Sequence, residues 1–413
     1  MLLAACGDDS SSDASVDAAT DVPGVDSGLD ASRDSGPARD ALPDVRAPLD
    51  ADLPMELEEL PVNEWRAVSR NTIDDVDPCP TDRCAWSAVE GQSGVVEDWT
   101  GGAYASEEGA LGGLVYFGGG HNGYYGNEVY FFDFATLMWE RRGEPTDGQT
   151  PGDATTFGLD EHCRFWDGAP LALHTYESVF YDPLQNRFWL SHVSDAPSGP
   201  PGPPAGCGSD RPAYFDFATS SWSDSSASPV QTVFAGSAWD ASRNRAWIVD
   251  TNASRVHSFD PVGDTWQSHA GGSPLGIDIA AAIAPSADLL VITDTRSAAR
   301  VVAFDLADPS QDWFEVTSEG DTEILGSSKL GFEWSPELDA FVAYSSGQSL
   351  YLLSVPSDPR SEAWTWTRID PGGVEPDAPV NGPYSKFQYV PEMGIAFVAS
   401  SVTGPVFAIR LAR

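Results

Sequence analysis

Two short stretches of the sequence place a histidine next to a tyrosine, and both side chains can move protons. The stretch HTYES has His174 two residues before Tyr176, and GGGHNGYYGN contains His121, Asn122 and Tyr124. A neutral imidazole can remove a proton from a substrate, and a tyrosine hydroxyl can supply one to a leaving group. We therefore predict His174 or His121 as a general base and Tyr176 or Tyr124 as the acid. The alternatives are a backbone hydrogen bond for His121 and simple packing for Tyr124.

A second chemical feature is a small set of cations in a chain that is otherwise acidic. Lys329 and Lys386 are the only lysines, and the stretch EHCRF places His162 close to Arg164. A cation can neutralise a substrate carboxylate, which makes the neighbouring proton easier to remove. The alternative is that the lysines only offset excess negative charge. We predict six ligand-binding residues: Asn122, Tyr124, His162, Arg164, Lys329 and Lys386.

Motifs for several other chemistries are missing from the sequence. It contains no HExxH zinc motif, no phosphate-binding loop and no dinucleotide fingerprint. The run Asp74-Asp75-Val76-Asp77 could hold calcium, but a solvated linker is the simpler interpretation. We therefore expect no metal and no cofactor.

The composition restricts both the partners and the fold class. A formal net charge of -41 would repel nucleic acid and anionic membrane surfaces, so neither is an expected partner. Aromatic residues make up 11% of the chain, and it contains 39 glycines and 32 prolines. Such a composition is typical of many short strands joined by turns. We predict an all-β fold.

The strongest pattern is an internal repeat. The pair Phe-Asp occurs at 132, 215, 259 and 304, and tryptophans follow at 139, 222, 266 and 313. A second marker, an aromatic residue or isoleucine followed in most copies by proline two residues later, precedes an apolar run in five places. Four strands in a unit of about 45 residues are the pattern of a β-propeller blade.

The repeats resemble those of kelch-repeat and galactose-oxidase-like propellers, in which a diglycine closes the second strand and a tryptophan opens the fourth. Gly118-Gly119 and Trp139 carry this resemblance, whereas later blades keep the tryptophan and lack the diglycine. The resemblance covers most of residues 64–413. We predict six blades, at residues 94–142, 171–225, 231–270, 276–317, 327–369 and 381–413.

The sixth predicted blade lacks a fourth strand, and a segment far upstream can supply it. The stretch NEWRAV at residues 63–68 has the tryptophan-led character of a fourth strand. Pairing it with the C-terminal blade would close the ring and remove two exposed edges. A seventh blade within residues 70–93 is the alternative.

Strand direction predicts which face carries the chemistry. If each innermost strand begins at one face, called the top, then the second-to-third-strand loops and the links between blades also lie there. His174 with Tyr176, Lys329 and Lys386 begin the innermost strands of blades 2, 5 and 6. We therefore expect them at the mouth of the central channel. The longest top-face segments belong to blades 1 and 2 and span residues 70–93, 118–127, 143–172 and 193–212.

The amino-terminal sequence predicts a lipid anchor. Leu3-Ala4-Ala5-Cys6 resembles the bacterial lipobox, in which the cysteine is acylated, so residues 1–6 are interpreted as a truncated signal. Residues 7–60 contain 15 acidic residues and predict a disordered tether, and residues 61–413 form the propeller. Gly7 after Cys6 favours the outer membrane or cell surface, with membrane contact only through the lipid. A chance cysteine near a cytosolic start is the alternative.

The four remaining cysteines, Cys79, Cys84, Cys163 and Cys207, are an even number, as expected for disulfides in an oxidising compartment. Of three possible pairings we favour Cys79–Cys84, close in sequence, and Cys163–Cys207, on loops of the same predicted face. Free or metal-binding thiols are the alternative, although no CxxC spacing exists. Galactose oxidase chemistry is not implied, because its copper site needs a free cysteine beside a tyrosine.

These features predict a surface-tethered, monomeric propeller that binds a glycan or a surface protein through its top-face loops. The alternative is a polysaccharide lyase that cleaves uronic-acid polymers by β-elimination. Some such lyases resemble this chain in being propellers with histidine, tyrosine and lysine or arginine near the channel mouth. No lyase motif aligns residue by residue, so whether the chain is an enzyme stays open.

Overall fold

The computed structural model describes residues 51–77, 91–119, 124, 126–146, 160, 162, 164–193 and 211–412. These residues belong to one compact unit, Ala47–Arg413. The predicted signal and most of the predicted tether lie outside the described residues. None of the described helices combines the length and the apolar character needed to span a membrane.

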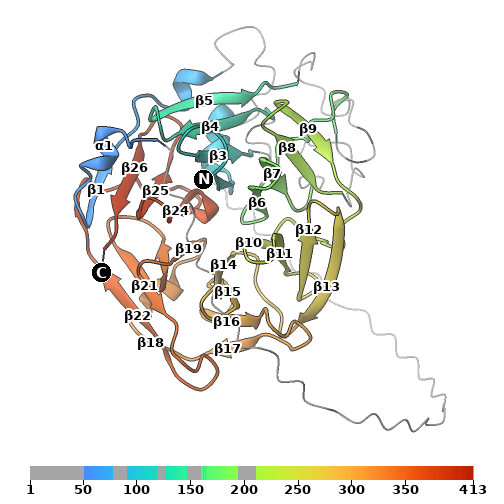
Figure 1. The fold of residues 1–413 in the computed structure, drawn as a ribbon, viewed down its shortest axis with the longest axis vertical. Coiled ribbons are helices and arrows are strands. Elements are labelled where there is room, and N and C mark those ends of the chain that lie inside the picture. The colour runs from blue at the N-terminus through green and yellow to red at the C-terminus, as the bar shows by residue number, and fades with distance from the viewer. Residues whose placement is uncertain are drawn as a thin grey trace, which may run out of the picture. The chain divides into compact units, whose positions relative to one another are not determined.

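The chain folds as an all-β propeller of six blades, as the repeat predicts (Figure 1). The innermost strands contact one another in the order β2, β6, β10, β14, β19, β24 and back to β2, so the ring is closed. The described parts of residues 70–93 contain only the short 3₁₀ turns η1 (Asp74–Val76) and η2 (Gly91–Ser93). Six blades are therefore confirmed over seven.

The first four blades are regular antiparallel sheets of four strands. Blade 1 consists of β2 (Gly101–Ala105), β3 (Gly113–Phe117), β4 (Val129–Asp133) and β5 (Met138–Gly143), and blade 2 of β6 (Val179–Asp182), β7 (Arg187–Leu190), β8 (Ala213–Asp216) and β9 (Ser221–Asp224). Blade 3 consists of β10 (Gly236–Asp240), β11 (Arg245–Asp250), β12 (Arg255–Asp260) and β13 (Thr265–Gly271), and blade 4 of β14 (Ile279–Ala284), β15 (Leu289–Asp294), β16 (Arg300–Asp305) and β17 (Phe314–Val316).

The last two blades each carry an additional short parallel strand at the outer edge. Blade 5 consists of β19 (Gly331–Ser335), β20 (Ala340–Tyr344), β21 (Leu350–Ser354), β22 (Trp364–Ile369) and the added β18 (Ser318–Gly320). Blade 6 consists of β24 (Gln388–Val390), β25 (Ile395–Ala399), β26 (Val406–Arg410), β1 (Glu64–Ala67) and the added β23 (Gly372–Gly373). Short helical turns connect some of these elements: α1 (Met55–Glu58), α2 (Gly94–Glu97), η4 (Thr322–Gly326) and η5 (Tyr384–Lys386).

The Phe-Asp repeat marks the hairpin between the third and fourth strands of a blade. In blades 1 to 3 the phenylalanine pairs directly across from the tryptophan: Phe132 with Trp139, Phe215 with Trp222 and Phe259 with Trp266. The aspartate then caps the turn, as where Asp260 Oδ1 accepts the backbone N–H groups of Val262 and Gly263, both at 3.0 Å. The sequence spacing is therefore the length of one tight turn between paired aromatic residues.

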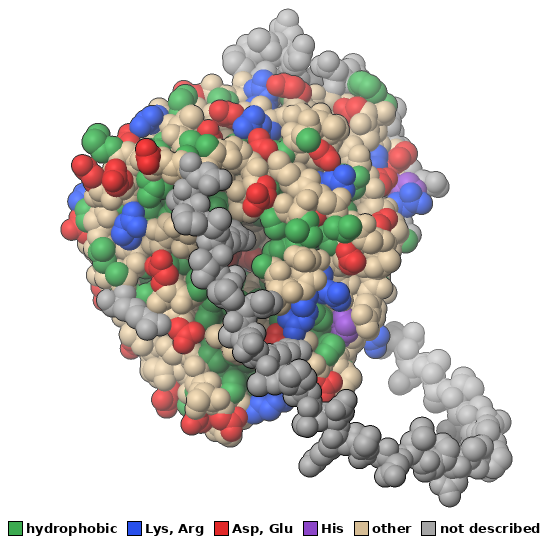
Figure 2. Space-filling view, in the orientation of Figure 1, with side chains coloured by type: hydrophobic (Ala, Val, Ile, Leu, Met, Phe, Trp, Pro, Cys, Tyr) green, Lys and Arg blue, Asp and Glu red, His purple; other side chains and the backbone are tan. Residues whose placement is uncertain are grey.

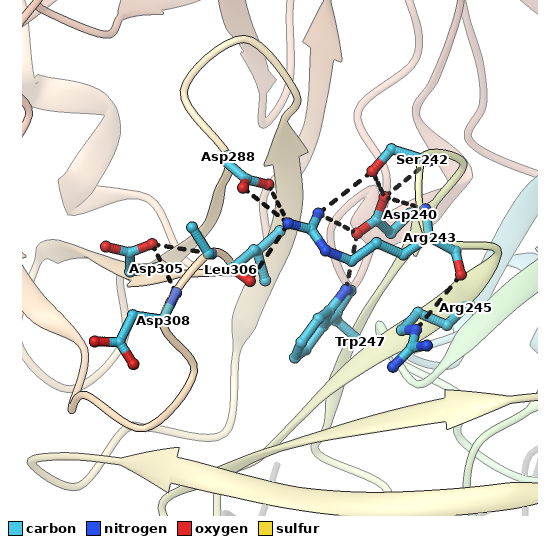
Figure 3. A network of polar contacts seen from close by, with 10 residues as sticks. Asp240, Ser242, Arg243, Arg245, Trp247, Asp288, Asp305, Leu306 and Asp308 are labelled. Atoms are coloured by element: carbon cyan, nitrogen blue, oxygen red, sulfur yellow. Dashed lines mark hydrogen bonds and ion pairs between the residues drawn. The ribbon is translucent and has the colours of Figure 1, made fainter. Parts of the chain in front are cut away.

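Polar contacts join neighbouring blades at the face where the innermost strands end. Arg243, in the turn between β10 and β11, lies 2.9 Å from the Asp240 carboxylate and 2.8 Å from that of Asp288 in blade 4 (Figure 3). Asp240 also accepts a hydrogen bond from Trp247 Nε1 at 3.1 Å. Because these side chains satisfy one another, we assign the network to the fold rather than to a binding site.

The strand β1 closes the ring, as predicted. Its residues Arg66 and Ala67 pair antiparallel with Ala408 and Phe407 of β26. Trp65 is fully buried, and its Nε1 donates to the Gln348 carbonyl at 2.9 Å. The N-terminal and C-terminal parts of the propeller therefore share the sheet of blade 6, where β1 covers the edge that β26 would otherwise expose.

Candidate functional site

Five side chains meet where the innermost strands begin, and we call this group the mouth ring: Trp99, His174, Tyr176, Lys329 and Tyr384. Lys329 Nζ lies 5.2 Å from the centre of the Trp99 ring, and the Trp99 and His174 rings are 4.7 Å apart. His174 Nδ1 and the Tyr176 hydroxyl are hydrogen-bonded at 3.1 Å. The rings of Tyr176 and Tyr384 lie 5.6 Å apart, and the Tyr384 N–H donates to the Lys329 carbonyl at 3.5 Å. The contacts form a closed circuit.

The backbone of the mouth ring is strained. Trp99, Tyr176, Lys329 and Tyr384 have φ angles of 48°, 47°, 65° and 45°, in the left-handed region that bulky residues rarely adopt. Each lies shortly before an innermost strand. The other left-handed non-glycine residues of the described chain lie in hairpin turns or, in one case, directly before β1. Such strain costs about 1–3 kcal/mol per residue and concentrates at ligand-binding and catalytic sites.

Blade 4 adds two residues that sequence reasoning missed. The Tyr384 hydroxyl donates to Asp278 Oδ1 at 2.8 Å, and Arg296 Nη1 lies 3.1 Å from Asp278 Oδ2. Burial, together with the Asp278 charge, raises the pKa of Tyr384, so its hydroxyl keeps its proton at neutral pH. Asp278 directly precedes β14, just as Trp99 and Tyr384 come shortly before β2 and β24. If the strand-start rule had been applied to every blade, it would have identified Asp278, Trp99 and Tyr384.

Only part of the mouth ring reaches solvent. His174 and Tyr176 are 4% and 8% exposed, and Tyr384 is fully buried. Trp99 and Lys329 are half-buried, and Arg296, which contacts Asp278, is exposed. A ligand at the mouth would therefore first contact the indole, the Lys329 ammonium and the Arg296 guanidinium.

Lys329 is held without a carboxylate partner among the described residues. Its Nζ donates to Asn381 Oδ1 at 3.4 Å, and Asn381 Nδ2 in turn donates to the Glu97 carbonyl at 2.6 Å. Burial lowers the pKa of Lys329 from its ordinary value. Asp278 acts on this ammonium only from a distance, so no carboxylate among the described residues contacts it directly, and an anionic ligand could provide that contact.

Lys386, predicted at the mouth, lies beneath it and is completely buried. Its Nζ donates to the Thr100 carbonyl at 2.6 Å. Burial lowers the pKa of Lys386 to about 7, and burial raises the pKa of Glu333, on β19, to about 8. The pKa of Glu177, which precedes β6, is also raised well above its ordinary value by burial and by Glu333. These three groups form an ionisable layer beneath the mouth ring, in which Lys386 and Glu177 are buried and Glu333 is half-buried.

Tyr124 is buried in the core of blade 1. It is 1% exposed, and its hydroxyl donates to Glu128 Oε1 at 2.5 Å. Tyr130 donates to the same oxygen at 2.8 Å. The nearby diglycine has a structural purpose as well, since a side chain on Gly118 would come within 2.3 Å of Thr100. For Tyr124 the packing alternative describes what the structure shows.

Arg164 and His162 lie beside β9, away from the mouth ring. The Arg164 side chain is 2% exposed, and its Nε lies 2.7 Å from Asp224 Oδ1. The backbone N–H of His162 donates to Asp160 Oδ1 at 2.8 Å. The structure thus brings His174, Tyr176 and Lys329 together and separates Arg164 and His162 from them. The roles of all these residues stay predictions.

Several predicted residues cannot be placed. His121, Asn122, the lipidation candidate Cys6 and the four disulfide candidates Cys79, Cys84, Cys163 and Cys207 lie outside the described residues. The pairing of the cysteines and the role of the GGGHNGYYGN loop therefore stay predictions.

Charge is distributed rather than concentrated on the face shown in Figure 2. Acidic and basic side chains of the described residues are interspersed there, so neither charge forms a single patch on that face. Within the described residues, no group of three or more histidine, cysteine, aspartate or glutamate side chains is arranged to hold a metal ion.

No protein-family model matches the chain, and no curated protein is detectably similar to it. The resemblance to kelch-repeat and galactose-oxidase-like propellers therefore stays a prediction, whereas the six-bladed fold is observed.

Proposed function

We propose that the chain is a ligand-binding propeller and that the mouth ring binds an acidic glycan. The proposal is carried by the mouth ring itself, in which four residues from four blades have a strained backbone, and one of them is Lys329, which forms no ion pair with a carboxylate among the described residues. Backbone strain of this kind is maintained where a fixed arrangement of side chains is needed.

The chemistry of the exposed part fits a sugar acid. Trp99 offers apolar contact to the C–H face of a sugar ring, as aromatic side chains commonly do in binding sites. Lys329 and Arg296 provide cations for a carboxylate, and Asn381 provides an amide for hydroxyl groups. A glycan is favoured over a protein ligand because these groups lie within one small area.

The proposal is tested by calorimetric titration of the full chain with hexamers of galacturonate, mannuronate and guluronate at low salt. We expect at least one hexamer to bind, and Lys329→Ala to weaken that binding at least tenfold. Arg66→Ala, which removes an exposed cation on the outer strand β1, is the matched control and should bind normally. Absence of binding by all three hexamers, or equal loss in both variants, would contradict the proposal.

A polysaccharide lyase is the second candidate, supported by one observation. The His174–Tyr176 hydrogen bond places a potential base beside a potential acid, next to Lys329. The support is weaker than for binding, because both side chains are nearly buried and a substrate carbon could reach them only if the mouth ring rearranged. Absorbance of unsaturated uronate that appears with the wild-type chain and disappears in His174→Ala would establish the lyase. An equal rate of unsaturated-uronate formation in the wild type and in His174→Ala would rule out His174 as the base of a lyase.

The location of the protein is a separate part of the proposal. We propose that Cys6 is acylated and that the acidic segment between Cys6 and the compact unit Ala47–Arg413 tethers the propeller to the outer membrane or cell surface. Metabolic labelling with a fatty acid, compared between the wild-type chain and Cys6→Ser, tests this directly. Label that persists in Cys6→Ser would exclude the anchor.

A further inference from the structure

A cleft lies beside β9, in the link between blades 1 and 2. It is a cleft of about 390 Å³, and we call it the hairpin cleft. This volume lies within the range of roughly 300–1,000 Å³ that is usual for small-molecule sites. The residues that line it include Asp160, Arg164, Trp166, Ser223 and Asp224.

A tight turn presents Trp166 at the edge of the hairpin cleft. The backbone N–H of Gly168 donates to the Phe165 carbonyl at 2.9 Å, and that of Phe165 donates to the Ala169 carbonyl at 2.9 Å. Gly168 has a φ of +84°, which closes the turn without the cost another residue would have. Phe165 is buried and anchors the turn, whereas Trp166 is 76% exposed. A large indole held out on an anchored turn suggests a contact surface, because tryptophan is usually mostly buried.

The base of the hairpin cleft is a fixed polar group. Arg164 Nε lies 2.7 Å from Asp224 Oδ1, and Nη2 donates to the carbonyls of Arg211 and Pro212 at 3.3 and 3.4 Å. Nη1 is buried without a hydrogen-bond partner within the described part of the chain. Asp160 Oδ1 accepts the Arg164 N–H at 3.0 Å. Both carboxylates are thus oriented by the protein, which prepares their acceptor oxygens for a ligand.

The charge of the hairpin cleft differs from that of the mouth ring. Among the residues that line the cleft, the two carboxylates Asp160 and Asp224 outnumber the single cation Arg164, which disfavours a uronate carboxylate there. Carboxylates accept hydrogen bonds from sugar hydroxyls, and an indole offers an apolar surface to the C–H face of a pyranose. We propose that the hairpin cleft binds an uncharged pyranose oligosaccharide, stacked on Trp166 with its hydroxyls on Asp160 and Asp224.

The test titrates the full chain with cellohexaose, xylohexaose, mannohexaose and maltohexaose in a calorimeter. We expect one of them to bind and Trp166→Ala to weaken it at least about tenfold, as for an aromatic anchor in an interface. Trp166→Phe keeps an aromatic ring and should lose less. Val262→Ala removes an apolar side chain that is 66% exposed, in a blade 3 turn, and should change affinity less than about twofold.

The outcomes separate this proposal from that for the mouth ring. If Trp166→Ala weakens binding of a neutral hexaose and Lys329→Ala leaves it unchanged, the proposal for the hairpin cleft is supported. This holds whether or not acidic glycans bind at the mouth ring. The proposal is overturned if none of the four hexaoses binds, if Trp166→Ala binds as the wild type does, or if the cleft instead binds a lysine-rich peptide. An independent readout is the oxidation of Trp166, measured by mass spectrometry of its peptides. The bound sugar should protect Trp166 from oxidation.

Discussion

The mouth ring and the hairpin cleft differ in what holds their side chains in place. The mouth ring takes residues from four blades and keeps four of them on a left-handed backbone. The hairpin cleft takes its residues from one turn and the neighbouring strand β9, and Trp166 is not among the residues with positive φ. The first site therefore depends on closure of the whole propeller, whereas the second is local. Their opposite charge suits different ligands.

The largest effect is expected from opening the closure. Trp65→Ala removes a fully buried indole from the strand that completes blade 6 and should lower the free energy of unfolding by about 3–5 kcal/mol. Because the mouth ring spans blades 5, 6, 1 and 2, binding there should fall more than binding at the hairpin cleft. Chemical denaturation and two titrations measure both quantities. An equal loss of affinity at both sites would show that the hairpin cleft depends on ring closure as much as the mouth ring does.

The ionisable layer under the mouth ring should make stability depend on pH. The pKa of Glu333 is raised to about 8 from an ordinary value of 4.5. At pH values between these two, the folded state keeps a proton on Glu333 that the unfolded state has released. This contribution is present below pH 4.5 and is lost as pH rises through 8, with a slope of at most about 1.4 kcal/mol per pH unit.

Glu333→Gln should remove that slope while keeping an acceptor for Gln388 Nε2, which donates to Glu333 at 2.9 Å. Urea denaturation of both proteins at several pH values between 5 and 8 measures it. The wild type should lose stability relative to the variant as pH rises. A constant difference across the window would show that Glu333 is already ionised.

Lys329→Ala sharpens the comparison through salt dependence. We expect binding of a uronate hexamer to weaken about tenfold, or roughly 1.4 kcal/mol, because the only half-buried ammonium at the mouth is lost. Added salt should weaken wild-type binding at the mouth and leave neutral-sugar binding at the hairpin cleft unchanged. Titrations at two salt concentrations decide this, and identical salt dependence at both sites would contradict it.

The smallest effect is expected at Tyr384. Tyr384→Phe removes the hydrogen bond to Asp278, which keeps its contact with Arg296, so stability should fall by about 1 kcal/mol. Mouth binding should weaken slightly and hairpin-cleft binding should not change. Thermal denaturation and the same two titrations measure this. A loss at the hairpin cleft would reveal coupling that the structure gives no reason to expect.

The fold could be predicted from the sequence because its pattern is local. Phe-Asp and the following tryptophan describe a hairpin whose length is set by a capped turn, and Phe259 with Trp266 shows the pairing directly. The closing strand was predictable since the last blade lacked one. Both inferences depend on strand periodicity and edge pairing, which can be recognised in a single sequence.

The site was predictable only in part, because side-chain direction depends on backbone angles that the sequence does not display. Strand starts placed His174, Tyr176 and Lys329 at the mouth, and the structure brings them together. The same rule placed Lys386 there, but it turns inward to the Thr100 carbonyl. Trp166 carried no repeat signal and stands out only once the turn that holds it is seen.

The central claim is that the mouth ring recognises the negative charge of a glycan. The most direct test titrates the full chain carrying Trp166→Ala, which removes the hairpin cleft, with hexagalacturonate and with its methyl ester. The two ligands differ in charge and little else. We predict that the acid binds at least about tenfold more tightly than the ester and that adding Lys329→Ala abolishes this difference. Equal affinity for the acid and the ester, or no binding of the acid, would contradict the account.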